Sequence, residues 1–350
     1  MYPMTFGVLG CGHAAQRLHL PALGRLPGVR LAAIAEPDEN LRRSARRLAP
    51  SAQEFGDFRE LLAADGLDAV LISLPPALHA EAAVTAFEQG LHVYLEKPLA
   101  TNLEDGRAIV AAWRAAGRVA QIGFNFRYHP LVVRMREAIR EGLVGEPIAV
   151  RAEFCSGGRE LADWKRRRAS GGGVLLDLAS HQFDMVAHLL DRPVESVQCL
   201  LQDRASECDT ALVGLGLADG VSGSVFTALS SVARYVVEVT GSEGQLCFDR
   251  YRDSRLRFIP ARRRFSRSAR FQALAATLAD WPHAARDALF PPRERSYLAA
   301  LGAFVECVRS GSPAVPGLPE GLQNLAVVEA AERSARERRS IGVTDSGERP

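Results

Sequence analysis

The stretch TFGVLGCGHAAQ, residues 5–16, decides the fold. It begins as a short apolar run, and Gly10, Gly12 and Ala15 complete a G-x-G-x-x-A pattern. Gly10 permits a tight turn, and Gly12 lets the backbone approach a pyrophosphate held at the N-terminus of the following helix. Such glycine turns are common, so the pattern gains its weight from its place between a strand and a helix. In that place it predicts the phosphate-binding turn of a dinucleotide-binding sheet.

An acidic residue ends the next apolar run, 30–36. Glu36 stands 21 residues after Ala15, where a carboxylate would accept hydrogen bonds from a ribose 2′-hydroxyl and repel a 2′-phosphate. This position favours NAD as the cofactor. Arg42 and Arg43 keep NADP open as an alternative.

The remainder of residues 1–125 repeats the alternation of strand and helix. Further apolar runs, at 69–75, 92–96 and 118–124, are separated by amphipathic stretches that end near glycine. Apolar strands that alternate with helices predict a parallel, doubly wound sheet with both faces buried. The fold class expected here is α/β, a Rossmann domain that binds a dinucleotide.

The pattern changes beyond residue 145, within a second predicted domain at 126–350. A long apolar helix is predicted at about 174–190. The strand candidates are 146–156, 194–202, 210–218, 221–229, 235–241 and 245–250, several separated by the turn signals ADG and GSEG. They predict an α+β domain with an open, mostly antiparallel sheet. An Arg- and Ala-rich segment, 260–292, is interpreted as a helical insertion, and helices at 296–309 and 320–337 close the chain.

The totals exclude several classes of protein. With 47% hydrophobic residues, 24% charged residues and a net charge of +2, nothing indicates a nucleic-acid partner or a disordered chain. The six cysteines are scattered without a CxxC motif, which is typical of a reduced, cytoplasmic protein. No basic leader precedes the first apolar run and no run is long enough to span a membrane, so we expect a soluble protein without a membrane partner.

Lysine is rare in this chain. Of the 43 lysine and arginine residues, only Lys97 and Lys165 are lysine. Lys97 directly follows the run 92–96, at the edge of the predicted sheet where ligands bind. A compact ammonium can hydrogen-bond one small oxygen and its pKa falls on burial, whereas arginine stays charged. The simpler interpretation is a loop lysine paired with Glu96, and Lys165 shows that lysine occurs elsewhere. The scarcity nevertheless favours a functional Lys97.

A stripe of polar residues follows the predicted apolar helix. Its members recur at helical spacing: Asp177, His181, Asp184, His188 and Asp191. A solvated helix face is the simpler interpretation, but other helices of the chain use Arg and Glu there. A metal site is disfavoured because no further cluster of ligands accompanies the stripe. An acid one turn before a histidine can orient the imidazole as a general base or acid. The glycines at 171–173 would let backbone and substrate approach closely.

Taken together, these motifs resemble the glucose–fructose oxidoreductase / inositol dehydrogenase family. The resemblance covers essentially the whole chain and includes GCGHAA, SLPPALHAEAA, EKPLA, GFNFRYHP, GGGVLLDLASHQFD, the GSEG hairpin and YLAALGAFVECVRSG. The pairing of EKP with a glycine-led D-x-x-x-H is the specific part. The resemblance implies an N-terminal Rossmann domain and a C-terminal open sheet, one face of which often makes an oligomer interface. A homo-oligomer, a dimer or tetramer, is therefore expected.

The resemblance also implies roles for individual residues. By position, Lys97 matches the family's catalytic lysine, Asp177 its helix aspartate and His181 its acid/base histidine. The implied cofactor-binding residues are Gly10, Gly12, His13, Ala14, Ala15, Glu36, Leu74, Pro75, His79, Glu96, Lys97 and Asn125. The implied substrate contacts are Arg127, Tyr128, Trp164 and Arg167, together with Asp177 and His181.

The function expected from these residues is hydride transfer between nicotinamide and a secondary alcohol or ketone of a sugar, cyclitol or nucleotide sugar. His181 would take the hydroxyl proton while Asp177 fixes the imidazole. Lys97 would hydrogen-bond the same oxygen and stabilise its developing charge. One alternative is an NAD-assisted glycosidase on the same fold. Another is a sensor that binds nucleotide without chemistry, which predicts erosion of these three residues.

Arginine is concentrated between residues 250 and 270. A solvated rim is the favoured interpretation. The alternative is attraction of an anionic substrate, to which the arginines at 166–168 would add.

Overall fold

The computed structural model describes residues 3–157, 163–253, 255–261 and 296–343, without the side chains of residues 163 and 164. Its first sheet is parallel throughout, in the order β3-β2-β1-β4-β5-β6. The strands are β1 (Met4–Leu9), β2 (Val29–Ala35), β3 (Gln53–Phe55), β4 (Ala69–Ile72), β5 (His92–Leu95) and β6 (Ala120–Ile122). All were predicted except β3, a short edge strand. The predicted doubly wound sheet is confirmed.

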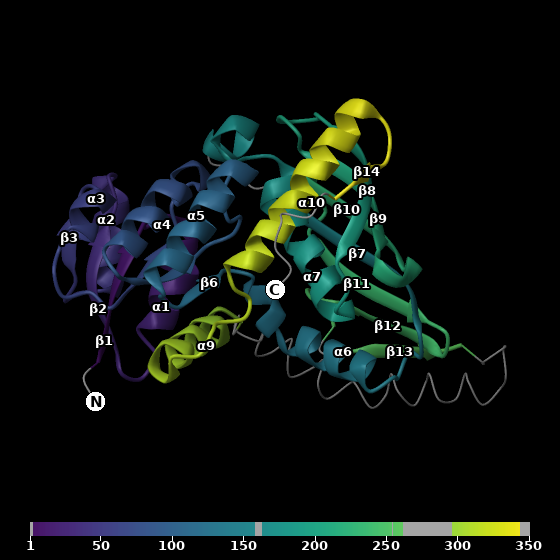
Figure 1. Cartoon of the computed structure of the whole chain (residues 1–350), viewed down its shortest axis with the longest axis horizontal. Helices are drawn as coiled ribbons and strands as arrows, with labels where there is room; N and C mark the ends of the chain where they lie inside the picture. Colours follow the sequence, from purple (N-terminus) through teal and green to yellow (C-terminus); the bar gives the residue numbers. More distant parts are fainter. Residues whose placement is uncertain (1–2, 158–162, 254, 262–295, 344–350) are drawn as a thin grey trace.

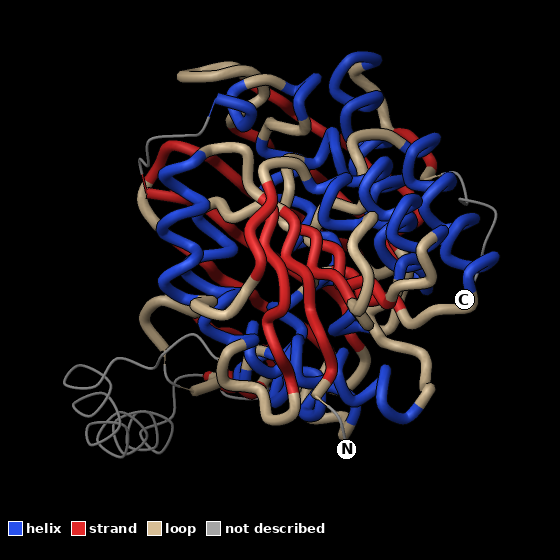
Figure 2. The backbone as a smooth tube through the Cα atoms, turned by 90° about the vertical axis from the view of Figure 1, so that its left-hand side faces the viewer, coloured by secondary structure: helices blue, strands red, loops and turns tan. Residues whose placement is uncertain are grey.

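Helices cover both faces of this sheet, as Figure 2 shows with red strands running between blue helices. They are α1 (Leu20–Leu23), α2 (Glu39–Leu48), α3 (Phe58–Leu62), α4 (His79–Glu88) and α5 (Leu103–Ala116). Local chemistry sets their ends. The Asp38 carboxylate accepts from the backbone of Asn40 and Leu41 to begin α2, and α5 ends at Gly117 in the left-handed conformation.

The second sheet has the order β13-β12-β11-β7-β10-β9-β8-β14. Its strands are β7 (Pro147–Gly157), β8 (Val194–Gln202), β9 (Thr210–Leu217), β10 (Ser222–Ser231), β11 (Arg234–Gly241), β12 (Gly244–Asp249), β13 (Arg257–Pro260) and β14 (Ile341–Gly342). In the described part of the sheet every pair is antiparallel except β7 with β10. The predicted α+β domain with a mostly antiparallel sheet is confirmed.

Helices cover one face of the second sheet. The helix α7 (Ser180–Leu190) packs on β7 and β10, and α10 (Leu318–Glu337) packs on β8 and also on α5 (Figure 1). The opposite face carries exposed apolar side chains in neighbouring registers. Leu200 pairs with Leu212, which pairs with Phe226, and these side chains are 64%, 47% and 37% exposed.

The chain returns to the first sheet near its C-terminus. Phe304, in α9 (Ser296–Ser310), packs edge-on against Phe6 and Tyr94, with ring centroids 6.1 and 5.8 Å away. The predicted domain boundary assigns this helix to the second domain, although Phe304 packs on the first sheet. The first sheet needed a further helix on this face because its apolar strands are buried on both sides.

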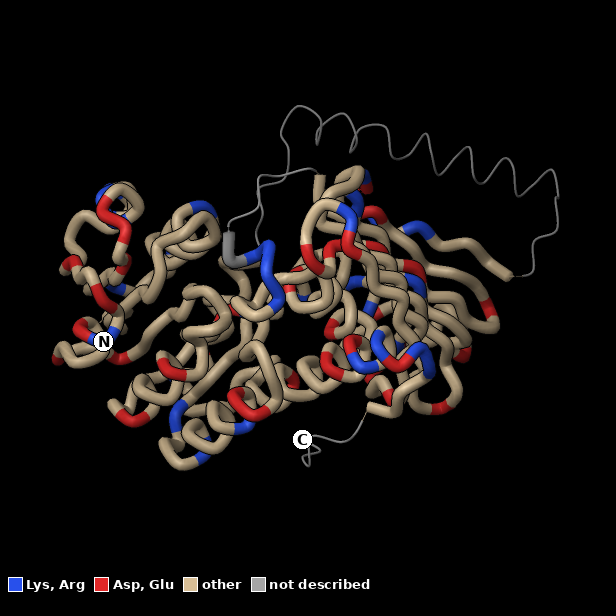
Figure 3. Tube along the Cα trace, turned by 90° about the horizontal axis from the view of Figure 1, so that it is seen from above, with Lys and Arg blue, Asp and Glu red and all other residues tan. Residues whose placement is uncertain are grey.

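Three other expectations bear on the surface of the molecule. Most of the predicted insertion at 260–292 lies outside the described residues. Among the described helices, none combines the length and apolar character that a membrane crossing needs. Along the Cα trace in Figure 3, basic and acidic residues are interspersed over both parts of the chain, as the small net charge predicts.

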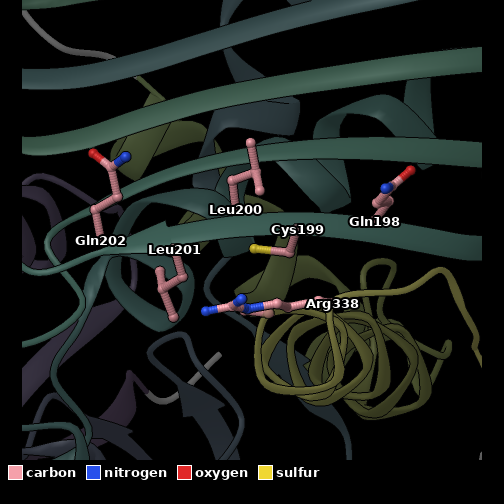
Figure 4. Close-up of a pocket in the computed structure, with 7 residues that line it drawn as sticks. Gln198, Cys199, Leu200, Leu201, Gln202 and Arg338 are labelled. Carbon is pink, nitrogen blue, oxygen red and sulfur yellow. The ribbon is translucent and has the colours of Figure 1, made fainter.

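A hollow lies between β8 and α10, away from the predicted site. Figure 4 shows the residues that line it on β8, with Arg338 at the end of α10 beneath them. None of the residues predicted for the site lines this hollow. This hollow is therefore not the predicted functional site.

Candidate active site

The carboxyl ends of the parallel strands meet at one edge of the first sheet. Gly10 follows β1, Glu36 follows β2, Pro75 follows β4 and Lys97 follows β5 by two residues. This is the edge at which ligands of doubly wound sheets bind. The alternation of strand and helix therefore places the two predicted motifs, the glycine turn and the lysine, side by side.

The glycine turn fits a dinucleotide phosphate. Gly10 has φ +85°, and a Cβ there would lie 2.5 Å from the carbonyl oxygen of Ser73. At Gly12 a Cβ would meet no described atom within 4 Å, so the backbone faces open space that a phosphate can fill. Of the other predicted contacts, His13 is exposed, Ala14 half-buried and Ala15 buried.

Glu36 is tied to the turn it was predicted to assist. Its carboxylate accepts hydrogen bonds from the backbone of Cys11, at 2.7 Å, and of Asp38, at 3.1 Å. The carboxylate keeps further lone pairs for a ribose hydroxyl. The neighbouring arginine that left NADP open is engaged elsewhere: Arg42 donates to the backbone carbonyl of Glu36 and lies 3.7 Å from Glu54. The arrangement fits NAD.

His79 holds two loops of the cofactor edge together. Its ring is fully buried, with Nδ1 2.8 Å from the carbonyl of Pro98 and Nε2 3.0 Å from the carbonyl of Leu74. Burial lowers the pKa of His79. The ring therefore joins the loop after β4 to the cis peptide of Lys97–Pro98. Its predicted contact with the cofactor stays a prediction.

Glu96 and Asn125 complete this side of the edge. Glu96 lies 2.8 Å from Nε2 of buried His19 and accepts from the backbone of Lys97 at 3.1 Å. Asn125 is buried, and its amide donates to Ser296 at 2.8 Å. Its carbonyl oxygen has no partner among the described residues, so it remains available to a bound group.

Both lysines of the chain converge on one carboxylate. The ammonium of Lys97 lies 3.2 Å from Oδ1 of Asp177 and also donates to the Asp177 backbone carbonyl. The ammonium of Lys165 donates to Oδ2 of Asp177 at 2.7 Å. From the sequence we assign Lys165 no functional role and use it only to show that lysine occurs elsewhere. The scarcity that singled out Lys97 applied equally to Lys165 and would have found it.

Two of the three glycines before Asp177, Gly172 and Gly173, accommodate the segment that carries Lys165. A Cβ at Gly172 would clash with the carbonyl carbon and oxygen of Lys165 and with the carbonyl of Arg167, and Gly173 donates its backbone N–H to the Lys165 carbonyl at 3.3 Å. We expected these glycines to let backbone and substrate approach closely. Gly172 and Gly173 let the backbone around Lys165 approach, and the approach of a substrate stays a prediction.

His181 is positioned differently from the prediction. A π turn, Leu175–Ala179, carries Asp177 and precedes α7, so the register of a regular helix is broken between Asp177 and His181. Within the described part of the chain no hydrogen bond joins these two side chains. The His181 ring instead stacks on Phe126, with centroids 4.4 Å apart and planes 27° apart. The aromatic residue fixes the imidazole, which sequence reasoning missed.

The electrostatics of the site follow from burial and from the lysines. Burial lowers the pKa of Lys97, and it lowers the pKa of His181 well below its ordinary value with a further contribution from the Lys97 charge. Burial opposes ionisation of Asp177, but Lys165 and Lys97 together hold its pKa well below the usual range. At neutral pH the site therefore holds a neutral imidazole and an ionised carboxylate.

Arg250 also belongs to the site. Its guanidinium carbon lies 4.1 Å from the centroid of Phe126, and its charge contributes to the lowered pKa of His181. The solvated-rim interpretation is wrong for this residue. It holds for Arg252 and Arg257, which are 68% and 59% exposed and lie near Asp249 and Asp253.

The residues predicted to contact substrate do not all lie at one place. Arg127 has a side chain that is only 10% exposed, and it makes a bidentate contact with Asp184, the third member of the polar stripe. The hydroxyl of Tyr128 donates to the carbonyl of Val315 at 2.8 Å. Arg167 is exposed, and the side chain of Trp164 lies outside the description. For all four the substrate contact stays a prediction.

Two family profiles match the chain. A profile described as an oxidoreductase family with an NAD-binding Rossmann fold matches residues 4–124. A second profile, described as the GFO/IDH/MocA C-terminal domain, matches residues 132–247. Together they span the first sheet, strands β7 to β11 of the second sheet and most of the predicted site.

Individual relatives match over nearly the whole chain. Myo-inositol 2-dehydrogenase of Thermotoga maritima is 27% identical over 348 residues, which cover 97% of this chain and 98% of that protein. dTDP-3,4-didehydro-2,6-dideoxy-alpha-D-glucose 3-reductase of Actinomadura kijaniata is 27% identical over 339 residues and 96% of each chain. A solved levoglucosan dehydrogenase, in complex with NADH and levoglucosan, shares the fold with a TM-score of 0.83 at 22% identity, covering 98% of this chain and 100% of its own.

Proposed function

The chain belongs to the GFO/IDH/MocA family of oxidoreductases with an NAD-binding Rossmann domain, and from this premise we propose that it oxidises a secondary alcohol of a sugar or cyclitol, or reduces the corresponding ketone. One observation carries the proposal. A lysine and a neutral histidine, Lys97 and His181, stand beside the NAD-binding edge of the sheet. A hydride transfer at a secondary alcohol needs such a pair, one group to stabilise the oxygen and one to hold its proton.

The chain's own residues suit the cofactor. The turn at Gly10 and Gly12 would hold the pyrophosphate, and Glu36 would accept a hydrogen bond from the adenosine ribose. Glu96 and the free carbonyl oxygen of Asn125 lie at the other end of the same edge. When bound, the nicotinamide supplies the acceptor or donor of hydride.

The proton is handled by side chains of both sheets. His181 is neutral at neutral pH, so it can accept the hydroxyl proton during oxidation and return it during reduction. Lys97 donates to the same oxygen and stabilises the negative charge that develops there. Asp177 holds the two lysines and not the imidazole, so its proposed role shifts from orienting His181 to orienting Lys97.

The names of the relatives support a polyhydroxylated ring as the substrate. The two curated relatives described above are named for myo-inositol and for a deoxygenated nucleotide sugar. The substrate class proposed for this chain is therefore a sugar, cyclitol or nucleotide sugar, with NAD preferred over NADP.

The test is NADH formation, followed at 340 nm, from NAD with cyclitols, free sugars, uronic acids and nucleotide sugars. Stoichiometric NADH with any member supports the proposal and rejects the NAD-assisted glycosidase. Transient NADH with release of a sugar would establish the glycosidase instead. NAD binding without turnover of any member would favour the sensor.

We further propose that the bare face of the second sheet joins two copies of the chain. Leu200, Leu212 and Phe226 form a contiguous exposed row there. Light scattering after gel filtration should give a dimer or tetramer. Leu212→Glu should shift it to the monomer, and a monomeric wild-type chain would contradict the proposal.

A further inference from the structure

Lys165 has no role in the mechanism so far. Its ammonium nevertheless contacts the same carboxylate as Lys97, and the side chain is only 30% exposed. The chain supplies these two contacts with the only two lysines among its 43 basic residues. The backbone is also shaped for the contact, because Gly172 and Gly173 admit the Lys165 carbonyl. A surface lysine would need neither feature.

We propose that Lys165 is a positioning residue of the active site. It holds one carboxylate oxygen of Asp177, so that Lys97 contacts only the other and directs its one remaining donor to the reacting oxygen. An ammonium has three donors. Lys97 uses its donors on Oδ1 and on the backbone carbonyl of Asp177. With Lys165 on Oδ2, the carboxylate cannot move over to surround Lys97.

The charges around the two lysines favour this division. Glu96 and Asp177 favour the charged form of Lys97, whereas Lys165 opposes it. His181 faces Lys97, Lys165, Asp177 and Arg250. Removing Lys165 takes away a like charge and gives Lys97 the whole carboxylate. Both changes raise the pKa of Lys97. They also draw the Lys97 ammonium toward Asp177 and away from a substrate.

The rarity of lysine makes a direct test practical. Protein labelled with ¹³C-lysine has two side-chain signals, which Lys97→Arg and Lys165→Arg assign. We expect the Lys97 signal to titrate about one pH unit higher in Lys165→Met than in the wild type, because a like charge a few ångströms away is removed. Lys165→Gln serves the same purpose if the methionine variant does not fold. If the Lys97 signal titrates at the same pH in the variant as in the wild type, the proposal is overturned.

Kinetics give the second readout, which rests on the proposed function. In Lys165→Met the limb of the kcat/KM profile that reports Lys97 should move upward with the NMR titration, and kcat should fall at least tenfold. Lys165→Arg should restore most of the wild-type profile because it keeps the charge. Arg333→Met, which removes an exposed cation paired with Glu337 on α10, should leave the profile unchanged.

The outcomes separate the two proposals. A loss of activity in Lys165→Met with an unshifted pH profile would mean that Lys165 only stabilises the loop, which overturns its positioning role. Failure of the wild type to turn over any sugar would count against the proposed function, while the NMR titration would still decide the role of Lys165.

Discussion

The cofactor half and the substrate half of the site differ in which groups form them: backbone in one, side chains in the other. The cofactor half is made mostly of backbone. It consists of the turn at Gly10 and Gly12, and within this turn the Cys11 N–H donates to the Glu36 carboxylate. The substrate half is made of side chains from separate segments: Lys97 and Lys165 contact Asp177, and His181 stacks on Phe126. A backbone site needs particular glycines at fixed spacing, whereas a side-chain site needs only that distant residues meet. Substitutions should therefore act differently on the two halves.

The largest effect is expected in the substrate half. Lys97→Met should lower kcat by about 10³-fold, because it removes both a hydrogen bond to the reacting oxygen and the charge that stabilises it. NADH binding, measured by fluorescence titration, should be nearly unchanged. Loss of NADH binding would show that Lys97 supports the fold of the edge, and the separation of the two halves would fail.

Lys97→Arg is the matched variant of this prediction. It keeps the positive charge but replaces a compact donor with a planar fork that stays protonated. We expect it to recover less than a tenth of the lost activity. Full recovery would mean that charge alone is required and that the choice of lysine in an arginine-rich chain is incidental.

The next effect tests the backbone half. Gly12→Ala adds a methyl group to open space, so the melting temperature should hardly change, but NAD affinity should fall about tenfold or more because the methyl takes the place of the phosphate. Gly10→Ala should instead destabilise the protein by about 1–3 kcal/mol, since φ is +85° and Ser73 is too close. Equal loss of stability in both variants would contradict this division.

A smaller effect is expected for cofactor choice. Glu36→Gln keeps an acceptor for the backbone of Cys11 but removes the charge that repels a 2′-phosphate. The preference for NAD over NADP, as the ratio of kcat/KM values, should fall about tenfold. Glu39→Gln, on an exposed pair with Arg43, should leave it unchanged. An unaltered preference in Glu36→Gln would place the discrimination elsewhere.

The last effect is on stability and comes from five histidines of both domains, of which two are buried and three half-buried. The pKa of His129 is lowered to about 4, that of His188 to about 3, and those of His79, His92 and His181 are also lowered, in each case chiefly by burial. Because the unfolded chain binds these protons first, their contribution to stability is complete above about pH 6.5 and is lost as pH falls. The melting temperature should therefore decrease from pH 7 to pH 5.

His129→Asn provides the control for this titration. Nδ1 of His129 accepts from the backbone of Leu131 at the start of α6 (Pro130–Arg140), and asparagine can do the same. The variant should lose one proton from the pH dependence of unfolding without losing the helix cap. A melting temperature that is flat between pH 7 and pH 5 would contradict the whole prediction.

Much of the fold could be predicted because its signals are local. The strands of the first sheet are apolar runs bounded by helix caps and glycines, and those of the second alternate buried and exposed residues, as β9 does. The short strands β3 and β14 lack such a signal, and the return of α9 to the first sheet depends on which apolar surface remained uncovered.

The cofactor edge and the candidates Lys97, Asp177 and His181 could be predicted from short segments of the chain, because a glycine turn, a rare lysine and a helical spacing are local features. The contacts between these side chains depended on tertiary packing. A π turn took Asp177 out of the register that helical spacing predicts, so the carboxylate went to two lysines and the imidazole to Phe126. Contacts between segments follow from packing and from the pairing of buried charges, and neither is written in the spacing of residues along one helix.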